Sequence, residues 1–542
     1  MDNPLQLLQD WLTYVNVQLL GLKPFRIDPI RVPLLVAGCA ALVWAALSSN
    51  SNVHITRLCD WGRARSCRRM TGVVAVLLVV GLTYLSLRQY YDFTAESYDL
   101  GIYSSVLWHT AHGNWFYDAL RNDHFLGDHF GPILLAFAPL YLVKASPVWL
   151  LLVQTIALGL GALAVGMLTA RLTRNATLVS VALLLYVANP YLHTLAALDF
   201  HLIALAIPVF LWMLYCLETA RHAWALVLGG VALLVEESLA PGVVSIGVYL
   251  MVFRRECRWI GVTLAATAAL WFLLVVAVFL PYHGNGALTH WHRFDNLGPD
   301  FKTAVFNLVT NPWLVFHEGL VTHYKFFYLV RLLLAVGFLP LLAWREATLM
   351  VPPALMMLLS SEAGLFKLGY HYSAAVLPFV LYSTIHGLAK LAELRGESPL
   401  GWMQRERVAF CLVMAVLVLN IYEVREYRLN DADHGHTVAI NTVLESVPRD
   451  ASVRAEVNLV ARLSTRSHVA PIEDSVEQNF AWWTPEYFVL DFRTIEDNAG
   501  LDRSRRALVA HLMEDDRYGL VSGYDGVLAL KARDPSERAS RL

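Results

Sequence analysis

Acidic residues and histidines gather in one stretch of this chain, directly after a long apolar run at residues 73–87. Between Tyr90 and Phe130 the sequence carries Asp92, Glu96, Asp99, His109, His112, Asp118, Asp123, His124, Asp128 and His129. Carboxylates and imidazoles transfer protons near neutral pH, and both ligate divalent cations. Ionisable groups at a membrane are costly and therefore indicate function. The pattern predicts an active site in this stretch.

Asp99 is the first candidate for a catalytic residue. It lies in the sequence Ser97-Tyr98-Asp99-Leu100-Gly101, beyond the end of the apolar run. A carboxylate in this position can accept a proton from the hydroxyl of an acceptor, as a general base does. The alternative is structural, because aspartate commonly caps the N-terminus of a helix, here one predicted at residues 101–110.

An Asp-His pair occurs twice, as Asp123-His124 and Asp128-His129, at a spacing of five residues. A carboxylate beside an imidazole supports proton transfer, so Asp128 and His129 are further catalytic candidates. Asp123, Asp128 and His129 are candidate ligands for a divalent cation, although this spacing is not a standard zinc pattern. The alternative is a solvated loop in which Asp128 caps a surface helix.

Further polar residues stand at the ends of apolar segments, where they could bind a substrate. They are Asp199, His201, Glu236, Glu237, Arg331, Lys367, Tyr370 and His371. Arg331 could hold a phosphate through its guanidinium group, or it could extend along an apolar helix toward the interface. The carboxylates could instead end helices at the membrane surface, and the tyrosines could belong to an aromatic belt.

The composition predicts an α-helical polytopic integral membrane protein with about 11–12 transmembrane helices. The 542 residues are 57% hydrophobic and 16% charged, whereas soluble proteins carry about 25% charged residues. Arginine-rich loops, such as residues 63–69, mark the cytoplasmic side. On the resulting topology all the candidate groups fall on the outer face. The net charge of -2 gives no reason to expect a nucleic-acid partner.

Three parts follow from this topology. Residues 1–70 form an amphipathic or transmembrane extension with a basic cytoplasmic loop, and residues 71–422 form the transmembrane domain, with outer loops at 88–146 and 283–324. Within the first outer loop, residues 131–143 are too short to span and predict a helix on the membrane surface. After a last span at 408–422, residues 423–542 form a small extracytoplasmic α/β domain with strands at 451–457 and 487–492 and a closing hairpin at 518–531.

Several motifs resemble a bacterial family of multi-spanning proteins known as domain of unknown function 2079. They are Tyr98-Asp99-Leu100-Gly101, Gly127-Asp128-His129-Phe130-Gly131-Pro132, Asp199-Phe200-His201, Val235-Glu236-Glu237 and Tyr370-His371-Tyr372. The layout is similar to that of the C-type glycosyltransferases, GT-C. This resemblance implies transfer of a sugar from a polyprenyl-phosphate donor to an acceptor at the outer face, with Asp99 in the acidic position. Because Leu100 replaces the second acid of an Asp-Glu pair, the need for a divalent cation stays open.

The resemblance also implies a place in the bacterial cytoplasmic membrane, with the lipid bilayer and a polyprenyl-phosphate-linked sugar as partners. Two other classes of function remain. A transporter or flippase of lipid-linked or envelope intermediates would also carry intramembrane carboxylates, but such proteins more often show internal repeats. A non-catalytic scaffold or sensor would use the outer domain for binding.

Overall fold

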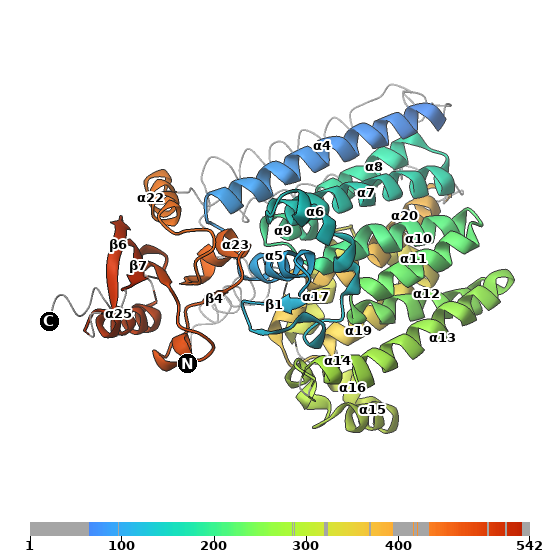
Figure 1. Ribbon diagram of the computed structural model, residues 1–542. Helices are drawn as coiled ribbons and strands as arrows, with labels where there is room; N and C mark the ends of the chain where they lie inside the picture. Colours follow the sequence, from blue (N-terminus) through green and yellow to red (C-terminus); the bar gives the residue numbers. More distant parts are fainter. Residues whose placement is uncertain are drawn as a thin grey trace, which may run out of the picture.

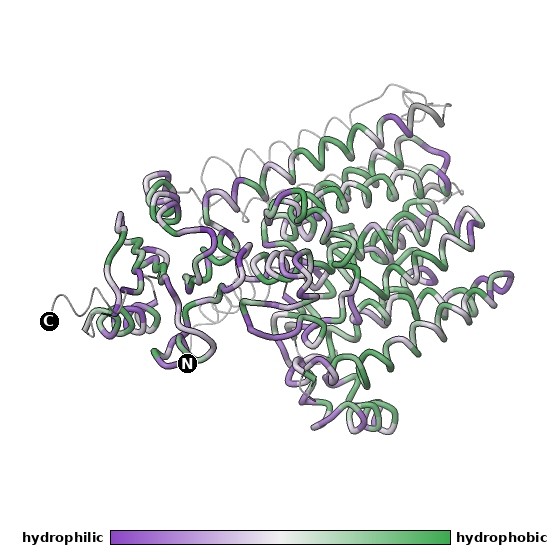
Figure 2. The backbone as a smooth tube through the Cα atoms, in the orientation of Figure 1, coloured by the Kyte–Doolittle hydropathy of each residue, from purple (hydrophilic) through white to green (hydrophobic). Residues whose placement is uncertain are grey.

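The computed structural model describes residues 64–95, 97–284, 286, 288–318, 323–367, 370–393, 416, 420, 433–495, 498–514 and 517–533. Most of them form a bundle of apolar helices, and the C-terminal residues form a separate α/β domain beside one end of this bundle (Figure 1). Hydrophobic residues follow the helices of the bundle, and hydrophilic residues concentrate in the connecting loops (Figure 2). Most of the predicted extension at residues 1–70 and of the predicted span at 408–422 lies outside the described residues, which include residues 64–70, Val416 and Asn420.

Four helical stretches are long and apolar enough to cross a bilayer: Arg68–Tyr91, Val148–Thr173, Leu178–Ala197 and Arg255–His283. The first two belong to α4 (Ala64–Tyr91) and α7 (Val148–Thr173). The third is divided between α8 (Ala176–Val187) and α9 (Pro190–Ala197), because Pro190 begins a new helix after the N-cap Asn189. The fourth contains α13 (Arg258–Leu274), a π-helical turn at Val275–Phe279 and α14 (Leu280–His283).

The remaining apolar helices are shorter. They are α10 (Ala206–Glu218), α11 (His222–Val235), α12 (Ala240–Phe253), α17 (His323–Leu334), α19 (Val351–Leu358) and α20 (Leu377–Glu393), and the short polar turn α18 (Trp344–Ala347) lies between α17 and α19. The sequence predicts two spans at 325–343 and 348–361, and the structure has there a bent pair of helical stretches, Lys325–Leu334 and Leu339–Leu358, that lie at 90° to each other. With this pair the described residues hold up to five span-length units, so the total of about 11–12 stays a prediction.

The predicted first outer loop, residues 88–146, contains only short elements. It contains α5 (Tyr98–Ala111), the hairpin of β1 (Tyr117–Asp118) and β2 (Asp123–His124), and α6 (Ala138–Val143) after a 3-10 turn at Pro132–Ala136. Leu142 and Val143 at the end of α6 are 68% and 79% exposed. An exposed apolar helix end of this kind fits the predicted helix on the membrane surface.

The second outer loop is also helical. It contains a 3-10 segment at Trp291–Leu297, followed by α15 (Phe301–Thr310) and α16 (Pro312–Phe316). The side chain of Asp300 accepts a hydrogen bond from the backbone N–H of Thr303 and thereby caps α15. The 3-10 segment is tied to the bundle, because the backbone carbonyl of Arg293 accepts hydrogen bonds from Ser360 and Ser361.

The C-terminal domain contains a five-stranded sheet of order β4-β3-β5-β7-β6. Its strands are β3 (Val453–Ala455), β4 (Val469–Pro471), β5 (Tyr487–Asp491), β6 (Tyr518–Tyr524) and β7 (Val527–Ala532). Its helices include α22 (His434–Glu445), α23 (Val460–Leu463) and α25 (Ala499–Glu514). β3 is parallel to β4 and β5, and β7 is antiparallel to β5 and β6. The closing hairpin is confirmed, and its turn is Asp525-Gly526, both with positive φ, as a type I′ turn requires.

This domain packs directly on α5, the helix that carries Asp99. A side chain at Gly101 would lie 3.1 Å from the side chain of Val460 and 3.4 Å from the backbone of Ala461, so glycine permits the close approach of α23. The buried hydroxyls of Ser464 and Ser104 are hydrogen-bonded at 2.7 Å. The position of α5 therefore depends on both the bundle and the C-terminal domain.

Candidate functional site

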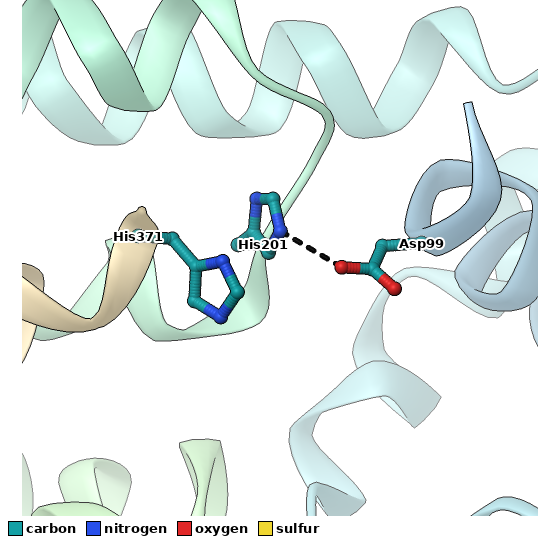
Figure 3. A group of neighbouring side chains, drawn as sticks. All are labelled: Asp99, His201 and His371. Atoms are coloured by element: carbon teal, nitrogen blue, oxygen red, sulfur yellow. Dashed lines mark hydrogen bonds and ion pairs between the residues drawn. The ribbon is translucent and has the colours of Figure 1, made fainter. Parts of the chain in front are cut away.

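Three residues that are far apart in the sequence meet at one end of the bundle, the end that the sequence predicts to be outside: Asp99, His201 and His371 (Figure 3). Nε2 of His201 lies 2.9 Å from Oδ2 of Asp99. The rings of His201 and His371 are stacked, with 3.6 Å between their centroids. His201 is 8% exposed and the Asp99 side chain is 42% exposed, so the carboxylate is held by a buried imidazole and remains open to solvent.

Asp99 occupies the first turn of α5, and Ser97 is the N-cap residue. The carboxylate of Asp99 is hydrogen-bonded to His201, so the alternative that it caps the helix is wrong. Asp199 supports this helix end instead, because its Oδ2 accepts a hydrogen bond from the backbone N–H of Leu100 at 3.4 Å. Asp199 is 3% exposed, and the structure therefore places it beneath α5.

Gln154, a buried residue of α7, fixes the orientation of His201. Oε1 of Gln154 accepts a hydrogen bond from the backbone N–H of His201 at 2.9 Å, and its Nε2 donates to the carbonyl of Asp199 at 3.2 Å. Nδ1 of His201 lies 3.0 Å from the same carbonyl. Because a carbonyl can only accept, Nδ1 carries the hydrogen, and Nε2 faces Asp99.

A second group of side chains surrounds His129. Its Nδ1 lies 3.2 Å from Oε1 of Glu237 and 3.9 Å from Oε1 of Glu236. The ring of His290 is 4.7 Å from that of His129, and Nε2 of His290 lies 2.8 Å from Oδ1 of Asp128. Asp128 also forms an ion pair with Arg121. The segment Pro132–Ala136 has Gly131 as its N-cap and α6 has Phe137, so the alternative that Asp128 caps the surface helix is wrong.

The two glutamates reach this group because the backbone is interrupted there. α11 ends at Val235, Glu236 is extended with φ -166° and ψ 145°, and α12 begins only at Ala240. Glu237 also accepts a hydrogen bond from the backbone N–H of Phe130 at 2.8 Å. The break therefore presents two adjacent carboxylates to the first outer loop.

The charges of the two groups influence one another. Burial disfavours the charged form of Asp99, but the hydrogen bond and charge of His201, together with the charge of His129, outweigh it and lower the pKa of Asp99. Burial also disfavours a charged His129, yet Glu237 and Glu236 raise the pKa of His129 to about 10. Burial, reinforced by the charges of His201, His129 and Arg293, holds the pKa of His371 well below its ordinary value. The site thus combines an anionic Asp99, a cationic His129 and a neutral His371.

The structure adds two residues that the sequence analysis missed, His290 and Arg293. Both belong to the second outer loop, and the guanidinium of Arg293 lies 5.8 Å from the centre of the Tyr372 ring. Arg293 is half-buried and contributes to the electrostatics of His371 and Glu236. Their sequence context, Thr289-His290-Trp291-His292-Arg293, is dense in histidine and arginine, and this density was the available signal.

The other predicted residues are Asp123, Lys367, Arg331 and Tyr370, which directly precedes His371. Asp123 is exposed and accepts a hydrogen bond from the neighbouring backbone N–H of His124, while His124 stacks on His283 at 4.1 Å. Lys367 and Tyr370 are exposed, and Arg331 is half-buried in the last turn of α17. No measured contact among the described residues brings Asp123, Lys367 or Tyr370 to Asp99.

These features describe a bundle of apolar helices with a group of carboxylates and imidazoles at one end. The chain belongs to the family DUF2079, described as predicted membrane proteins, whose model matches residues 89–529. This match covers α5, both histidine groups and most of the C-terminal domain. No curated protein matches the chain.

Proposed function

We propose that this protein is a glycosyltransferase that moves a sugar from a polyprenyl-phosphate donor to an acceptor hydroxyl. The observation that carries the proposal is the carboxylate of Asp99, which is ionised, 42% exposed and held on one side by the buried His201. A base needs an exposed lone pair within reach of the acceptor and a fixed orientation. Asp99 has both.

In the proposed reaction the acceptor oxygen attacks the anomeric carbon of the donor sugar. The bond between that carbon and the phosphate oxygen breaks, and the electron pair leaves with the polyprenyl phosphate. The proton of the acceptor hydroxyl passes to Asp99. His201 keeps the carboxylate in place during this step.

Arg293 is the proposed phosphate contact. Its guanidinium lies over Tyr372, adjacent to the His371 group, and none of the described carboxylates forms an ion pair with it within 4.0 Å. Arginine presents paired N–H donors that match phosphate oxygens. The predicted phosphate ligands Arg331 and Lys367 are less suited, since Lys367 is exposed and Arg331 belongs to the bent pair.

The donor lipid has an apolar path to this position. Phe279, in the π-helical turn after α13, stacks on Phe130 with 4.8 Å between centroids, directly beside His129. Along the same stretch Leu270, Leu273 and Val278 are 69%, 49% and 49% exposed. A polyprenyl chain lying against this surface would bring its phosphate to the second outer loop.

The proposal includes an orientation: a bacterial cytoplasmic membrane with the site and the C-terminal domain outside. Arginines mark the opposite loops, which include Arg254, Arg255 and Arg258. A reporter that is active only in the cytoplasm, fused to the C-terminus, is expected to give no signal. The same reporter fused after Arg255 is expected to be active, and the reverse pattern would contradict the orientation.

Transfer is tested with purified full-length protein and a polyprenyl phosphate that carries a radiolabelled sugar. We expect release of unlabelled polyprenyl phosphate and movement of the label to an acceptor or to water. A parallel vesicle assay follows the intact lipid-linked sugar from one leaflet to the other. Label that crosses the bilayer while the sugar–phosphate bond stays intact would contradict the transferase and support the flippase alternative.

A further inference from the structure

We infer that Asp99, His201 and His371 form a binding site for one divalent first-row transition ion, for which Zn²⁺ is the best match. One carboxylate oxygen and one nitrogen from each ring lie within 4.8 Å of one another. Three protein ligands with an open fourth position are the arrangement of catalytic zinc sites. The inference goes beyond the proposed function and does not depend on it.

The first argument is the hydrogen-bonding state of His201. Its Nδ1 faces the carbonyl of Asp199 at 3.0 Å, and its Nε2 faces the carboxylate of Asp99 at 2.9 Å. Both neighbours are acceptors, so the hydrogen on Nδ1 leaves a lone pair on Nε2 that points at a carboxylate. A cation must lie between them, either a proton or a metal ion. A ring nitrogen that donates to a backbone carbonyl while the other nitrogen binds the ion is the usual support of a metal-ligating histidine.

The surroundings of His371 favour a metal ion over a proton. A proton shared by His201 and Asp99 satisfies that pair but gives no role to the imidazole stacked on it at 3.6 Å. Among the described residues, no hydrogen-bond partner is found for either ring nitrogen of His371. This histidine is held at the start of the 3-10 segment His371–Ala375 that leads into α20. A metal ion uses the His371 nitrogen together with the other two ligands.

The neighbouring histidine groups fit a metal ion less well because their charges are already matched. His129 is cationic between Glu236 and Glu237, and Asp128 is paired with Arg121. A metal ion would have to displace these partners. At Asp99, by contrast, no lysine or arginine of the described residues pairs with the carboxylate within 4.0 Å. We therefore prefer Asp99, His201 and His371 as metal ligands over Asp123, Asp128 and His129, the candidates from the sequence.

The site leaves the proposed base intact. In the monodentate geometry only Oδ2 of Asp99 faces His201, so Oδ1 can still accept the proton of an acceptor. Leu100 replaces the second acid of the Asp-Glu pair, so the other two ligands are the imidazoles of His201 and His371, which come from two distant segments. The ion would add positive charge where the acceptor oxygen and the donor phosphate meet.

The test measures Zn²⁺ binding by the purified full-length protein after removal of metals with a chelator. We expect one tightly bound equivalent, measured by competition with a chromophoric chelator, and an absorption spectrum typical of tetrahedral coordination when Co²⁺ replaces Zn²⁺. His371→Ala and His201→Ala should weaken binding at least about 10–100-fold, the range for losing even an outer support of a site. His371→Cys keeps a zinc ligand and should retain most of the affinity.

The matched control is His283→Ala, which removes one ring of the stacked pair His124 and His283. Neither histidine belongs to a group of side chains whose ligand atoms lie close enough together to hold one metal ion. Binding by this variant should equal that of the wild type. Equal Zn²⁺ binding by His371→Ala and His283→Ala would overturn the inference, as would absence of a bound equivalent in the wild type. Melting temperatures without metal identify a variant that fails to fold, and the binding result is separate from any transfer assay.

Discussion

The bundle contains two clusters of polar side chains, one at each end of α10, and their charges are arranged differently. The outer cluster, which comprises Asp99, His201, His371, His129 and Arg293, precedes α10 and α20 and lies beside the break before α12. The other, here called the inner cluster, lies at the far ends of the same helices. It comprises Glu218, Tyr249, Arg254, Glu346, Tyr382, His386 and Lys390.

The inner cluster is closed. Glu218 forms an ion pair with Arg254 at 2.5 Å and accepts a hydrogen bond from Tyr382 at 2.7 Å. Glu346 lies 3.5 Å from Lys390 and accepts a hydrogen bond from Tyr249 at 3.2 Å. Each carboxylate is matched by a cation and a hydroxyl from another helix. Such a network fixes how the helices pack.

The outer cluster is open. Arg293 has no carboxylate partner among the described residues, His371 has no hydrogen-bond partner there, and the carboxylate of Asp99 is 42% exposed. Polar groups that the protein itself does not satisfy are available to a ligand. The comparison teaches that burial of charge in this bundle does not by itself indicate function, and that Arg293, His371 and Asp99 are the groups that the proposed ligands would use.

The sharpest test of this difference is Asp99→Asn. Asparagine preserves the size of the side chain but cannot accept a proton, so transfer should fall by about two to four orders of magnitude. Expression and melting temperature should change little. The measurement is transfer of labelled sugar by purified protein at matched concentration. Full activity of Asp99→Asn would reduce the outer cluster to a structural role like that of the inner one.

Glu218→Gln should have the opposite effect. It leaves Arg254 without its charge partner, and the unfolding free energy should fall by roughly 2–4 kcal/mol, below the full cost of breaking a buried pair because Arg254 is 35% exposed. Thermal unfolding in detergent measures this loss. Transfer per folded molecule should remain near that of the wild type, and a selective loss of transfer would place the inner cluster in the reaction.

Arg293→Ala should weaken donor binding. Hydrogen bonds to charged groups contribute about 1.5–3 kcal/mol each, so the KM for the polyprenyl-phosphate donor should rise roughly tenfold to hundredfold. Lys367→Ala, which removes an exposed cation, is the control and should leave KM unchanged. If both variants behave alike, the donor phosphate is bound elsewhere.

The last expected effect concerns pH. The pKa of His129 is raised to about 10 by Glu237 and Glu236, against burial. A raised pKa contributes stability that is fully present below the ordinary pKa of about 6.5 and is lost as the pH rises through the folded value. The melting temperature should therefore decline between pH 7 and 10, and less so in His129→Gln. Parallel declines in both proteins would show that His129 does not carry this dependence.

The sequence predicted features that depend on local patterns. The non-spanning segment at 131–143 followed from its length, and the closing hairpin at 518–531 followed from turn residues between two short apolar stretches, with the turn observed at Asp525-Gly526. The short parallel strand β4 was missed because three residues, Val469–Pro471, carry too little pattern to distinguish a strand from a loop. The sharp bend between α17 and α19 was missed because each half is apolar and reads as a span of its own.

The candidate site was predicted in outline only. Asp99, His201 and His371 were found because each follows an apolar segment on the predicted outer side. Their grouping depends on tertiary contacts, such as the hydrogen bonds of Gln154, that no local spacing encodes. His290 and Arg293 were missed because the second outer loop was interpreted as a connection, and only the folded chain shows that its 3-10 segment is fastened to Ser360 and Ser361.

The contact between Ser104 and Ser464 has a consequence for biosynthesis. The two residues are separated by 360 positions, and at about 5–20 residues per second roughly 20–70 s pass between their synthesis. During that interval α5 lacks the surface of α23 against which Gly101 packs. The packing of α5, and with it the position of Asp99, is therefore completed only after residues 460–464 have been synthesised and folded. A chain that stalls before that point would lack one of the two surfaces that hold α5.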